Sequence, residues 1–301
     1  MNLSTFDAFK HIRPEGSFYL DDDQLHRLQK VLLSMLHDLT ALAEENGIRL
    51  SLGGGSALGA TRHQGFIPWD DDIDLNIDRR DYDRFLQLLR EQRADRYWIH
   101  TPQDTHGYGI LSTRIRLKGT SVRMREDAYG DECGVTVDLF PIENTYDNAA
   151  LRRVHGFFCM LSGFLVSCRK AFRDRAELRA IGRDDPALKK TFGLKIALGF
   201  LSAWGSVDFW TRAADRCYRF CRDDGTAFVA IPAGRKHFTG ELYRRAAFCA
   251  LHKVRFEDGM FYCTKDIDNY MTRLFGDYHT LPAPEDRERH VFYSFDLGDA
   301  I

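Results

Sequence analysis

Residues 54–85 have the sequence GGSALGATRHQGFIPWDDDIDLNIDRRDYDRF, and the second half of this stretch decides the fold. From Asp72 to Ile77 polar and apolar residues alternate strictly, which is the pattern of a strand with one buried face. Asp72 and Asp74 lie on the polar face. The alternation therefore predicts a half-buried strand that carries carboxylates on one side.

A glycine-rich turn precedes this strand. Ile48–Leu52 is predicted to form a short strand that the glycines end, and Ser56 is a candidate cap for a short helix after them. The turn lacks the GK[ST] end of a P-loop and the GxGxxG dinucleotide fingerprint. Backbone amides of Gly54, Gly55 and Ser56 could still hold a phosphate at the helix start, and a purely structural tight turn is the alternative.

The acidic cluster needs a source of positive charge. Residues 70–74 include four aspartates, whose mutual repulsion a cation or basic groups must offset. On a strand, Asp72 and Asp74 leave the same face about 7 Å apart at Cα, a span that a divalent ion can bridge. Carboxylate oxygens favour Mg²⁺ or Mn²⁺, and Asp70 and Asp138 are further candidate ligands.

Three other interpretations of the aspartates compete with a metal site. A calcium loop would need glycine where Leu75 or Ile77 stands. A solvated acidic turn that caps a helix is common, but the strand alternation argues against it. Structural ion pairs would be compatible with catalysis, and the candidate partners are Arg62, Arg79 and Arg80.

The rest of the first half alternates between helices and strands. Asp22 or Asp23 is predicted to cap a helix that ends near Asn46, and Asp78 to cap another. Two more strands are expected: Ile110–Leu117, with Arg114 and Arg116 on one face, and Val135–Phe140, with Asp138 on its polar face.

After Pro141 the sequence changes character. Residues 146–225 have apolar residues at helical spacing, and beyond them FVAIPA and VRFEDGMFYC predict short strands before a helix at Ile267–Phe275. We expect an α+β fold with a mixed sheet flanked by helices in residues 1–145. Residues 146–301 are expected to be mainly helical and to form one cooperative unit with that core.

The most apolar run of the chain, Gly156–Cys168, is too short to span a bilayer and has arginines and lysine on its flanks. A buried helix is one interpretation of this run. A helix that lies in the plane of a membrane surface is the other.

Composition limits the partners and the compartment. The 301 residues carry a formal net charge of -2 with a pI of about 6.6, so no overall positive field attracts nucleic acid. Seven cysteines without a CxxC pair are typical of a reducing compartment, and residues 1–20 lack the pattern of a signal peptide. We expect a cytoplasmic protein with no nucleic-acid partner.

The quoted stretch resembles the signature of the LicD family, in which a glycine-rich turn precedes RHxGFIPWDDDID. Three further segments resemble family motifs: RIRLKGTS at 114–121, VTVDLFPIE at 135–143 and YMTRLFGDYHTLPAPEDRERH at 270–290. The helical middle of the chain has no such match. Gly53, Ala57 and Thr61 depart from the family pattern, but none of them removes a carboxylate.

This resemblance implies a nucleotidyltransferase-like fold, shared with fukutin and fukutin-related protein. The superfamily pattern is a glycine-serine turn, a DxD strand and a third acid on a neighbouring strand. Here it falls on Gly55 and Ser56, on Asp72 with Asp74, and on Asp138. Resemblance and residue pattern select the same catalytic acids.

The resemblance also implies a reaction. LicD proteins typically move phosphocholine from CDP-choline to a hydroxyl of a surface glycan or teichoic acid precursor, and CMP leaves. Metal at Asp72 and Asp74 would hold the diphosphate, while Asp138 or Asp70 would accept the hydroxyl proton or complete the metal shell. True nucleotidyl transfer and a decayed site that only binds ligand are the alternatives.

Basic residues near the acids are candidates for substrate contacts. Arg116, Arg114 and Arg62 are expected to neutralise the departing phosphate, and His63 to touch substrate. The alternative for Arg114 is a side chain that faces solvent, and for His63 a packed ring. No pattern identifies the aromatic cage that choline needs, so phosphoethanolamine and glycerol phosphate stay open.

The acceptor is expected to contact residues 146–225. Their apolar stripes could touch a membrane that bears a lipid-linked glycan. Such a peripheral contact would place the protein at the inner face of the membrane.

Overall fold

The strand predicted at the acidic stretch is present. The computed structural model describes residues 15–124, 132–181 and 185–300. In it β2 spans Ile73–Asp78, and Ile73, Leu75 and Ile77 are almost wholly buried while Asp74 is half-buried. The predicted alternation is confirmed for the apolar face, whereas Asp72 lies just before the strand and Asn76, on the predicted polar face, is 2% exposed.

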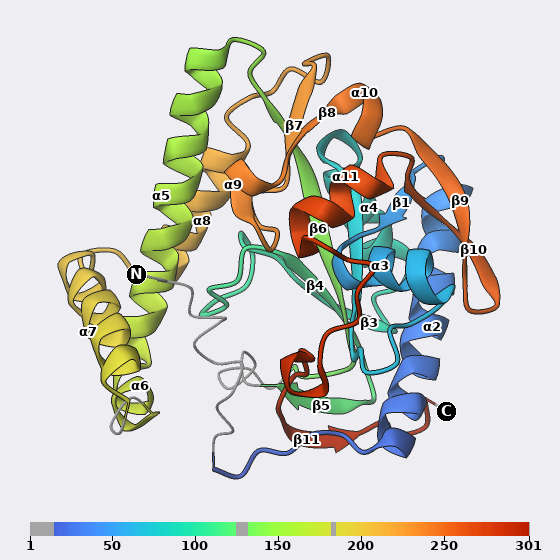
Figure 1. The fold of residues 1–301 in the computed structure, drawn as a ribbon, viewed down its shortest axis with the longest axis horizontal. Helices are drawn as coiled ribbons and strands as arrows, with labels where there is room; N and C mark the ends of the chain where they lie inside the picture. Colours follow the sequence, from blue (N-terminus) through green and yellow to red (C-terminus); the bar gives the residue numbers. More distant parts are fainter. Residues whose placement is uncertain (1–14, 125–131, 182–184, 301) are drawn as a thin grey trace.

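β2 lies in the middle of a mixed sheet (Figure 1). Among the described residues the sheet has nine strands, and its main path runs β3-β4-β6-β2-β1-β10-β9. β2 is parallel to β6 and β1 to β10, and the other pairs are antiparallel. The other strands are β1 (Leu50–Leu52), β3 (Tyr97–His100), β4 (Thr113–Leu117), β6 (Thr136–Thr145), β7 (Phe228–Ala230), β8 (Leu242–Arg244), β9 (Leu251–Phe256) and β10 (Gly259–Thr264). The α+β fold with a mixed sheet is confirmed.

β6 is longer than the sequence predicted. The expected strand ended at Phe140, whereas β6 runs on to Thr145. Its first part pairs with β2, and its last three residues pair with β7, which also pairs with β8. The extension depends on a partner more than eighty residues away, which local patterning does not reveal.

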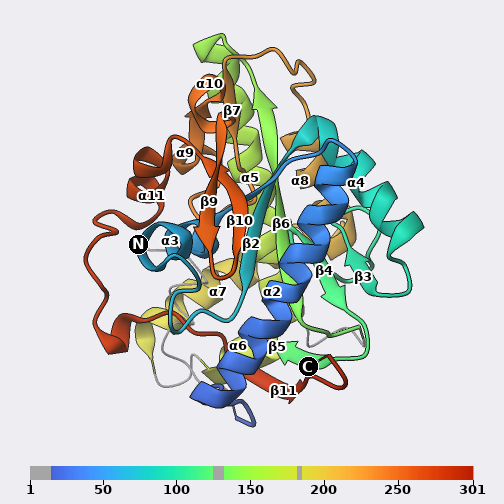
Figure 2. The same cartoon turned by 90° about the vertical axis from the view of Figure 1, so that its right-hand side faces the viewer.

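Two long helices of the first half follow their predicted apolar stripes. α2 (Asp22–Glu45) lies across the strands (Figure 2), and α4 (Arg79–Gln92) starts after its cap Asp78 as predicted. The cap of α2 is Asp21, not Asp22 or Asp23. The Asp21 carboxylate accepts from the Gln24 amide, and the Gln24 side chain accepts from the Asp21 amide, so the closing glutamine sets the helix start.

The helical region predicted after residue 145 is also present. α5 to α7 gather on the side of the molecule opposite α2 (Figure 1). A separate two-stranded sheet pairs β5 (Ser121–Met124) with β11 (Phe292–Asp296). The helices are α5 (Ala149–Arg173), α6 (Arg175–Ile181), α7 (Pro186–Leu201), α8 (Val207–Tyr218), α9 (His237–Gly240), α10 (Arg245–Phe248), α11 (Ile267–Phe275) and the 3-10 helix η2 (Pro284–Asp286).

α5 is not the buried helix that one interpretation of its apolar run predicted. Only 22% of its most apolar 18-residue window is buried. Among the described residues, it is the helix whose length and mean hydropathy of 1.2 would suit a bilayer. α5 packs against α7 and α8 with one face, and the residues that the structure describes leave its other face uncovered.

Candidate active site

Two neighbouring strands bring Asp74 and Asp138 together. In the parallel pairing of β2 with β6, Asp74 lies directly opposite Asp138. β4 flanks β6 on its other side and sets Arg114 opposite Asp138, whose Oδ1 accepts from Arg114 Nε at 3.2 Å and from Ser112 Oγ at 3.3 Å. Arg114 therefore faces the acids rather than solvent, and backbone register holds Asp138 beside the DxD strand.

The start of α3 (Gly54–His63) lies against Asp74. The Gly55 amide donates to Asp74 Oδ2 at 3.1 Å, while the Asp74 amide donates to Ser56 Oγ at 3.0 Å. The helix cap is Gly53, so the predicted capping role of Ser56 is wrong. Ser56 lies inside the helix, and its hydroxyl accepts from the Asp74 amide rather than from an amide of its own helix.

Gly54 sits where no side chain fits. Its φ is +38°, and a Cβ built on it would lie 2.0 Å from Asp74 Oδ2. Its amide donates at 2.9 Å to the hydroxyl of Tyr270 on α11, which also accepts from Asn76 Nδ2 at 3.3 Å. The amides of Gly54 and Gly55, which we expected to cradle a phosphate, thus donate to protein oxygens in this structure.

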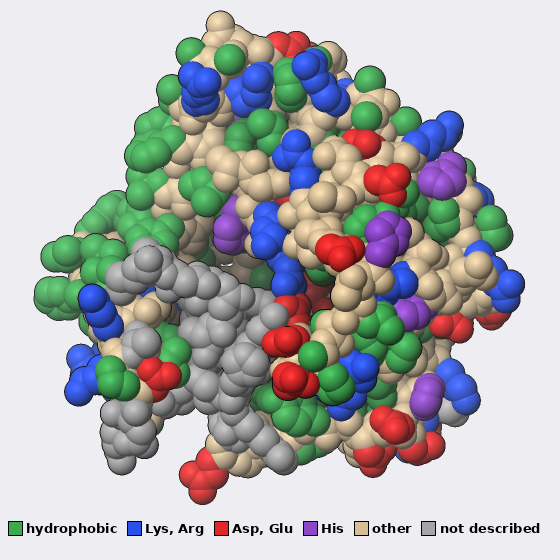
Figure 3. Space-filling model, viewed as in Figure 1, with side chains coloured by type: hydrophobic (Ala, Val, Ile, Leu, Met, Phe, Trp, Pro, Cys, Tyr) green, Lys and Arg blue, Asp and Glu red, His purple; other side chains and the backbone are tan. Residues whose placement is uncertain are grey.

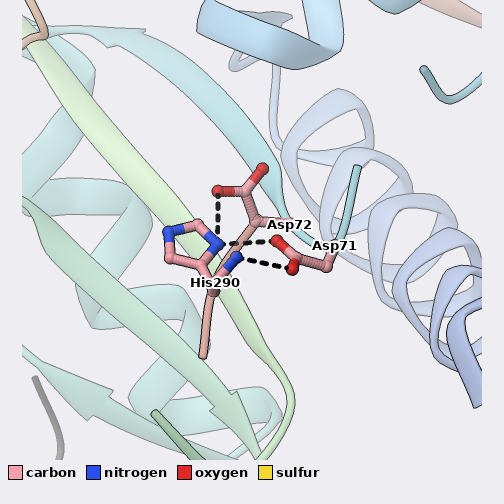
Figure 4. Close-up of side chains that lie close together, drawn as sticks. All are labelled: Asp71, Asp72 and His290. Carbon is pink, nitrogen blue, oxygen red and sulfur yellow. Dashed lines mark hydrogen bonds and ion pairs between the residues drawn. The ribbon is translucent and has the colours of Figure 1, made fainter. Parts of the chain in front are cut away.

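Asp71 is held by a histidine from far along the chain. His290 lies between η2 and β11, with its ring Nδ1 2.6 Å from Asp71 Oδ1, and its backbone amide donates to Asp71 Oδ2 at 3.0 Å (Figure 4). The same Nδ1 is 4.0 Å from Asp72 Oδ2. Asp71, Asp72 and His290 bring ligand atoms within 4.8 Å of one another, a grouping that could hold a metal ion.

Burial and mutual repulsion raise the pKa values of three carboxyls here, those of Asp70, Asp72 and Asp74. Burial raises the pKa of Asp72 to about 6, against the lowering effect of His290. Burial also raises the pKa values of Asp70 and Asp74 well above their usual range, and the charge of Asp72 adds to both. A bound cation would relieve this repulsion, so the electrostatics of the cluster favour cation binding.

Among the described residues, the group whose ligand atoms lie close enough to fit a divalent cation is Asp71, Asp72 and His290, not the predicted set of Asp70, Asp72, Asp74 and Asp138. Asp70, Asp72, Asp74 and Asp138 offer hard oxygen donors from β2, β6 and the segment before β2. The α3 backbone comes so close that a Cβ on Gly55 would lie 2.9 Å from Asp70 Oδ2. The absence of side chains in this turn leaves room for the carboxylates of Asp70 and Asp74 beside the α3 backbone.

Two of the predicted basic residues, Arg62 and His63, lie at the end of α3. Arg62 donates from Nη1 to the carbonyl of Tyr278 and from Nε to His63 Nε2, each at 3.0 Å. Burial lowers the pKa of Arg62, whereas the charge of Asp70 raises it. Burial lowers the pKa of His63 as well, and Arg62 adds to that effect. Arg62 therefore interacts electrostatically with Asp70, and the His63 ring accepts a hydrogen bond from it.

Arg116 is one step further from the acids than Arg114. It lies opposite Thr136 in the pairing of β4 with β6 and is 3% exposed. Arg114, opposite Asp138, is the arginine of β4 that contacts a site carboxylate.

Sequence reasoning did not single out three residues of the site, which are Asp71, Tyr270 and His290. Tyr270 lies 216 positions beyond Gly54, and His290 lies 219 positions beyond Asp71. The signal that could have found them is the segment 270–290, which begins with Tyr270 and ends with His290.

Comparison with known proteins agrees with this geometry. A model of the LicD/FKTN/FKRP nucleotidyltransferase domain matches residues 47–155, which contain the α3 turn, β2 and β6. The lipopolysaccharide cholinephosphotransferase LicD of Haemophilus influenzae is 44% identical over 273 residues, or 88% of this chain and 95% of that protein. The chain belongs to the LicD family. Membership identifies this LicD protein as a phosphotransferase.

Two shorter matches involve proteins of undescribed activity. An uncharacterised protein of Rickettsia typhi is 41% identical over 119 residues, 37% of this chain and 38% of that protein. One of Rickettsia prowazekii is 40% identical over 58 residues, 19% of this chain and 22% of that protein. The long Haemophilus match extends LicD similarity beyond the nucleotidyltransferase domain, into the helical region that carries no family motif.

Proposed function

We propose that this LicD-family enzyme moves phosphocholine, or a similar phospho-alcohol, from a CDP-linked donor such as CDP-choline to a hydroxyl of a cell-surface glycan and releases CMP. The acceptor would be a lipopolysaccharide or teichoic acid precursor, reached from the cytoplasmic face of the membrane. The main support is the 44% identity, over 88% of the chain, to an enzyme named for cholinephosphate transfer to lipopolysaccharide.

The chain's acids would hold the ion and receive the proton. Asp70, Asp72, Asp74 and Asp138 are the proposed ligands of Mg²⁺ or Mn²⁺, which when bound neutralises charge on the donor diphosphate. Asp70 would complete the metal shell or, as a free carboxylate, accept the acceptor's hydroxyl proton. Asp138 is the other candidate for that role.

The basic residues and the glycine turn would orient the donor. Arg114, held by Asp138, and Arg62, near Asp70, would neutralise the departing CMP phosphate, with Arg116 behind Arg114. His63 and the turn from Gly54 through Gly55 to Ser56 are the proposed remaining donor contacts.

Release of CMP from CDP-choline tests this reaction. The purified chain, Mg²⁺ and lipopolysaccharide or teichoic acid precursors should yield CMP, and EDTA should abolish the release until Mg²⁺ is restored. Asp72→Asn and Asp74→Asn should each lose about 100- to 1000-fold in rate. Asp95→Asn, which removes an exposed carboxylate on the turn after α4, should match the wild type.

Donors labelled in either half decide between transfer reactions. Choline label on the acceptor supports phosphocholine transfer, whereas nucleotide label there means nucleotidyl transfer. If no acceptor elicits CMP and Asp72→Asn behaves as the wild type does, the site is a decayed one that only binds.

A further inference from the structure

The uncovered face of α5 is lined by large apolar side chains. Leu151, Val154, Phe158 and Leu161 recur at intervals of three or four residues, so they share one helix face, and Phe157 lies beside them. Their exposed fractions are 53%, 53%, 47% and 39%, and that of Phe157 is 62%. A helix face that only faced water would carry polar side chains at these positions.

The end of α7 continues this apolar surface. Phe200, Leu201 and Trp204 are 64%, 70% and 73% exposed, and the Trp204 ring packs edge-on to Phe209, with the ring centroids 5.3 Å apart. α5 and α7 pack side by side. A groove of about 310 Å³ between them is lined by Leu161, Phe164, Leu165, Leu198, Leu201, Ser202, Trp204 and Trp210. Figure 3 shows the hydrophobic side chains gathered over these two helices.

The segment that forms the apolar surface carries an excess of positive charge. Residues 149–222 carry 15 lysines and arginines against 6 aspartates and glutamates, a formal charge of +9 in a chain whose total is -2. Arg153 near the start of α5 is exposed, as are Lys189 and Lys190 on α7 and Arg179 on α6. Apolar side chains edged by lysine and arginine match the surface of an anionic bilayer.

The attachment of α5 favours a helix in the plane of the membrane over one that crosses it. His155, on the inner face of α5, is 3% exposed and lies 3.0 Å from Thr145 Oγ1 through Nδ1 and 2.9 Å from the Cys217 carbonyl through Nε2. These contacts join α5 to β6 and α8 at mid-core. Crossing a bilayer would break them and expose Cys159 and Val166, which are 2% exposed.

We propose that the α5–α7 face, defined by the exposed apolar residues of α5 and α7 with Trp204, docks on an anionic phospholipid bilayer. A second copy of the chain fits this face less well, because the exposed cations Arg153, Lys189 and Lys190 on α5 and α7 would repel those of the other copy. The inference rests on the proposed function in one respect, since a bilayer is where a lipid-linked glycan acceptor would lie.

Co-flotation of the full chain with vesicles tests this docking. The chain should float with vesicles of phosphatidylcholine and phosphatidylglycerol, and less with phosphatidylcholine alone. The variant Phe157→Ser/Phe200→Ser/Trp204→Ser should bind about tenfold more weakly or worse, because three exposed aromatic side chains are removed. Arg153→Glu/Lys189→Glu/Lys190→Glu should lose the preference for phosphatidylglycerol.

Met260→Ser/Leu281→Ser is the matched control, because it removes two apolar side chains, 55% and 53% exposed, outside the α5–α7 face. It should float as the wild type does. No flotation of the wild type, or equal flotation of the triple serine variant, would overturn the proposal. A third outcome would also overturn it: light scattering shows that the wild type is a dimer, the triple serine variant is a monomer, and neither protein binds vesicles.

Flotation and catalysis are separable. Asp72→Asn should float normally while its CMP release falls about 100- to 1000-fold. The triple serine variant should release CMP normally with a short water-soluble glycan. A wild type that floats but releases no CMP with any acceptor would refute the proposed reaction and leave the docking intact.

Discussion

At Gly54 the α3 backbone lies so close to the Asp74 carboxylate that there is no room for a Cβ atom. A methyl group there would lie 2.0 Å from Asp74 Oδ2, so Gly54→Ala must push that carboxylate aside. We expect CMP release to fall by about 100-fold, because misplacement of a reacting group by about 1 Å costs that much.

Gly47→Ala is the control for backbone strain alone. Gly47 has a φ of +71° and nothing within 4 Å of a built Cβ. It should cost about 1 kcal/mol of stability and leave CMP release unchanged. Equal activity of the Gly54→Ala variant and the wild type would show that Asp74 need not hold its position.

Glu241 gives the protein a measurable pH dependence. Its side chain is buried, and burial raises its pKa to about 8, against the lowering effect of a hydrogen bond from the Lys236 amide. In the unfolded chain it titrates near about 4.3, so between these values the folded state binds more protons. Stability from this group is complete below the unfolded pKa and falls as pH rises, until it is lost above about 8.

Glu241→Gln should remove that dependence. Between pH 6 and pH 8, the free energy of unfolding measured in urea should fall by about 2 kcal/mol more for the wild type than for the variant. Glu285→Gln, at an exposed site on η2, should keep the wild-type dependence. Parallel stability curves for Glu241→Gln and the wild type would mean that Glu241 is ionised throughout.

On the scale of elements, a buried ion pair ties α4 to β6. Arg79, the first residue of α4, donates to both carboxylate oxygens of Glu143, and their side chains are 10% and 2% exposed. Asp215 of α8 lies 3.9 Å from Arg79 Nη2. Three elements from separate parts of the chain thus meet at one guanidinium.

Arg79→Met should cost about 3–5 kcal/mol in the free energy of unfolding, because it leaves buried carboxylates without a partner. Arg79→Met combined with Glu143→Met should recover part of that loss in chemical denaturation. Arg80→Met, which removes an arginine side chain that is 61% exposed, should cost less than about 1 kcal/mol. Equal losses for the Arg79 and Arg80 variants would contradict the structural role of the buried pair.

Elements with strong local patterns were predictable from the sequence. The stripes of α2 and α4 and the apolar face of β2 are confirmed, and α11 has the predicted bounds. β3 and β5, of four residues each, were not predicted, because their pairing partners rather than their own sequence define them. The uncovered face of α5 could not be predicted either, since a local pattern does not show which side α7 covers.

The site divides in the same way. Asp74, Asp138 and Arg114 follow from strand periodicity, and the structure brings them together. Outside the site, the cap Asp21 also has a local sequence signal, which is Gln24 three residues later. Tyr270 and His290 reach the site only through tertiary folding, because they are 216 and 219 positions from Gly54 and Asp71 in the sequence. The spacing of residues near the aspartates therefore does not predict them.

On the scale of the whole molecule, the sheet joins both parts of the chain. β1 pairs with β2 on one side and with β10 on the other, where Ser51 lies opposite Tyr262. Phe256, Phe261 and Tyr270 belong to the same apolar core as α2 and β2. We therefore propose that residues 1–145 and 146–301 unfold as one cooperative unit.

A fragment of residues 1–145 should not fold by itself. It lacks β9, β10 and α11, so the edge of β1 and the apolar side of the sheet would face water. Thermal unfolding followed by circular dichroism should show no sharp transition for the fragment and one for the full chain. A cooperative transition in the fragment would instead mark residue 145 as a true domain boundary.

The contact of His290 with Asp71 also sets an order of events during synthesis. The two residues are 219 positions apart, and a ribosome that adds about 5–20 residues per second needs roughly 10–45 s to cover that distance. During this time the aspartates of the turn exist without their histidine, and Gly54 without Tyr270. The first half of the chain thus emerges from the ribosome with an unfinished active centre, and the nascent protein acquires its full set of contacts only after residue 290 has been made.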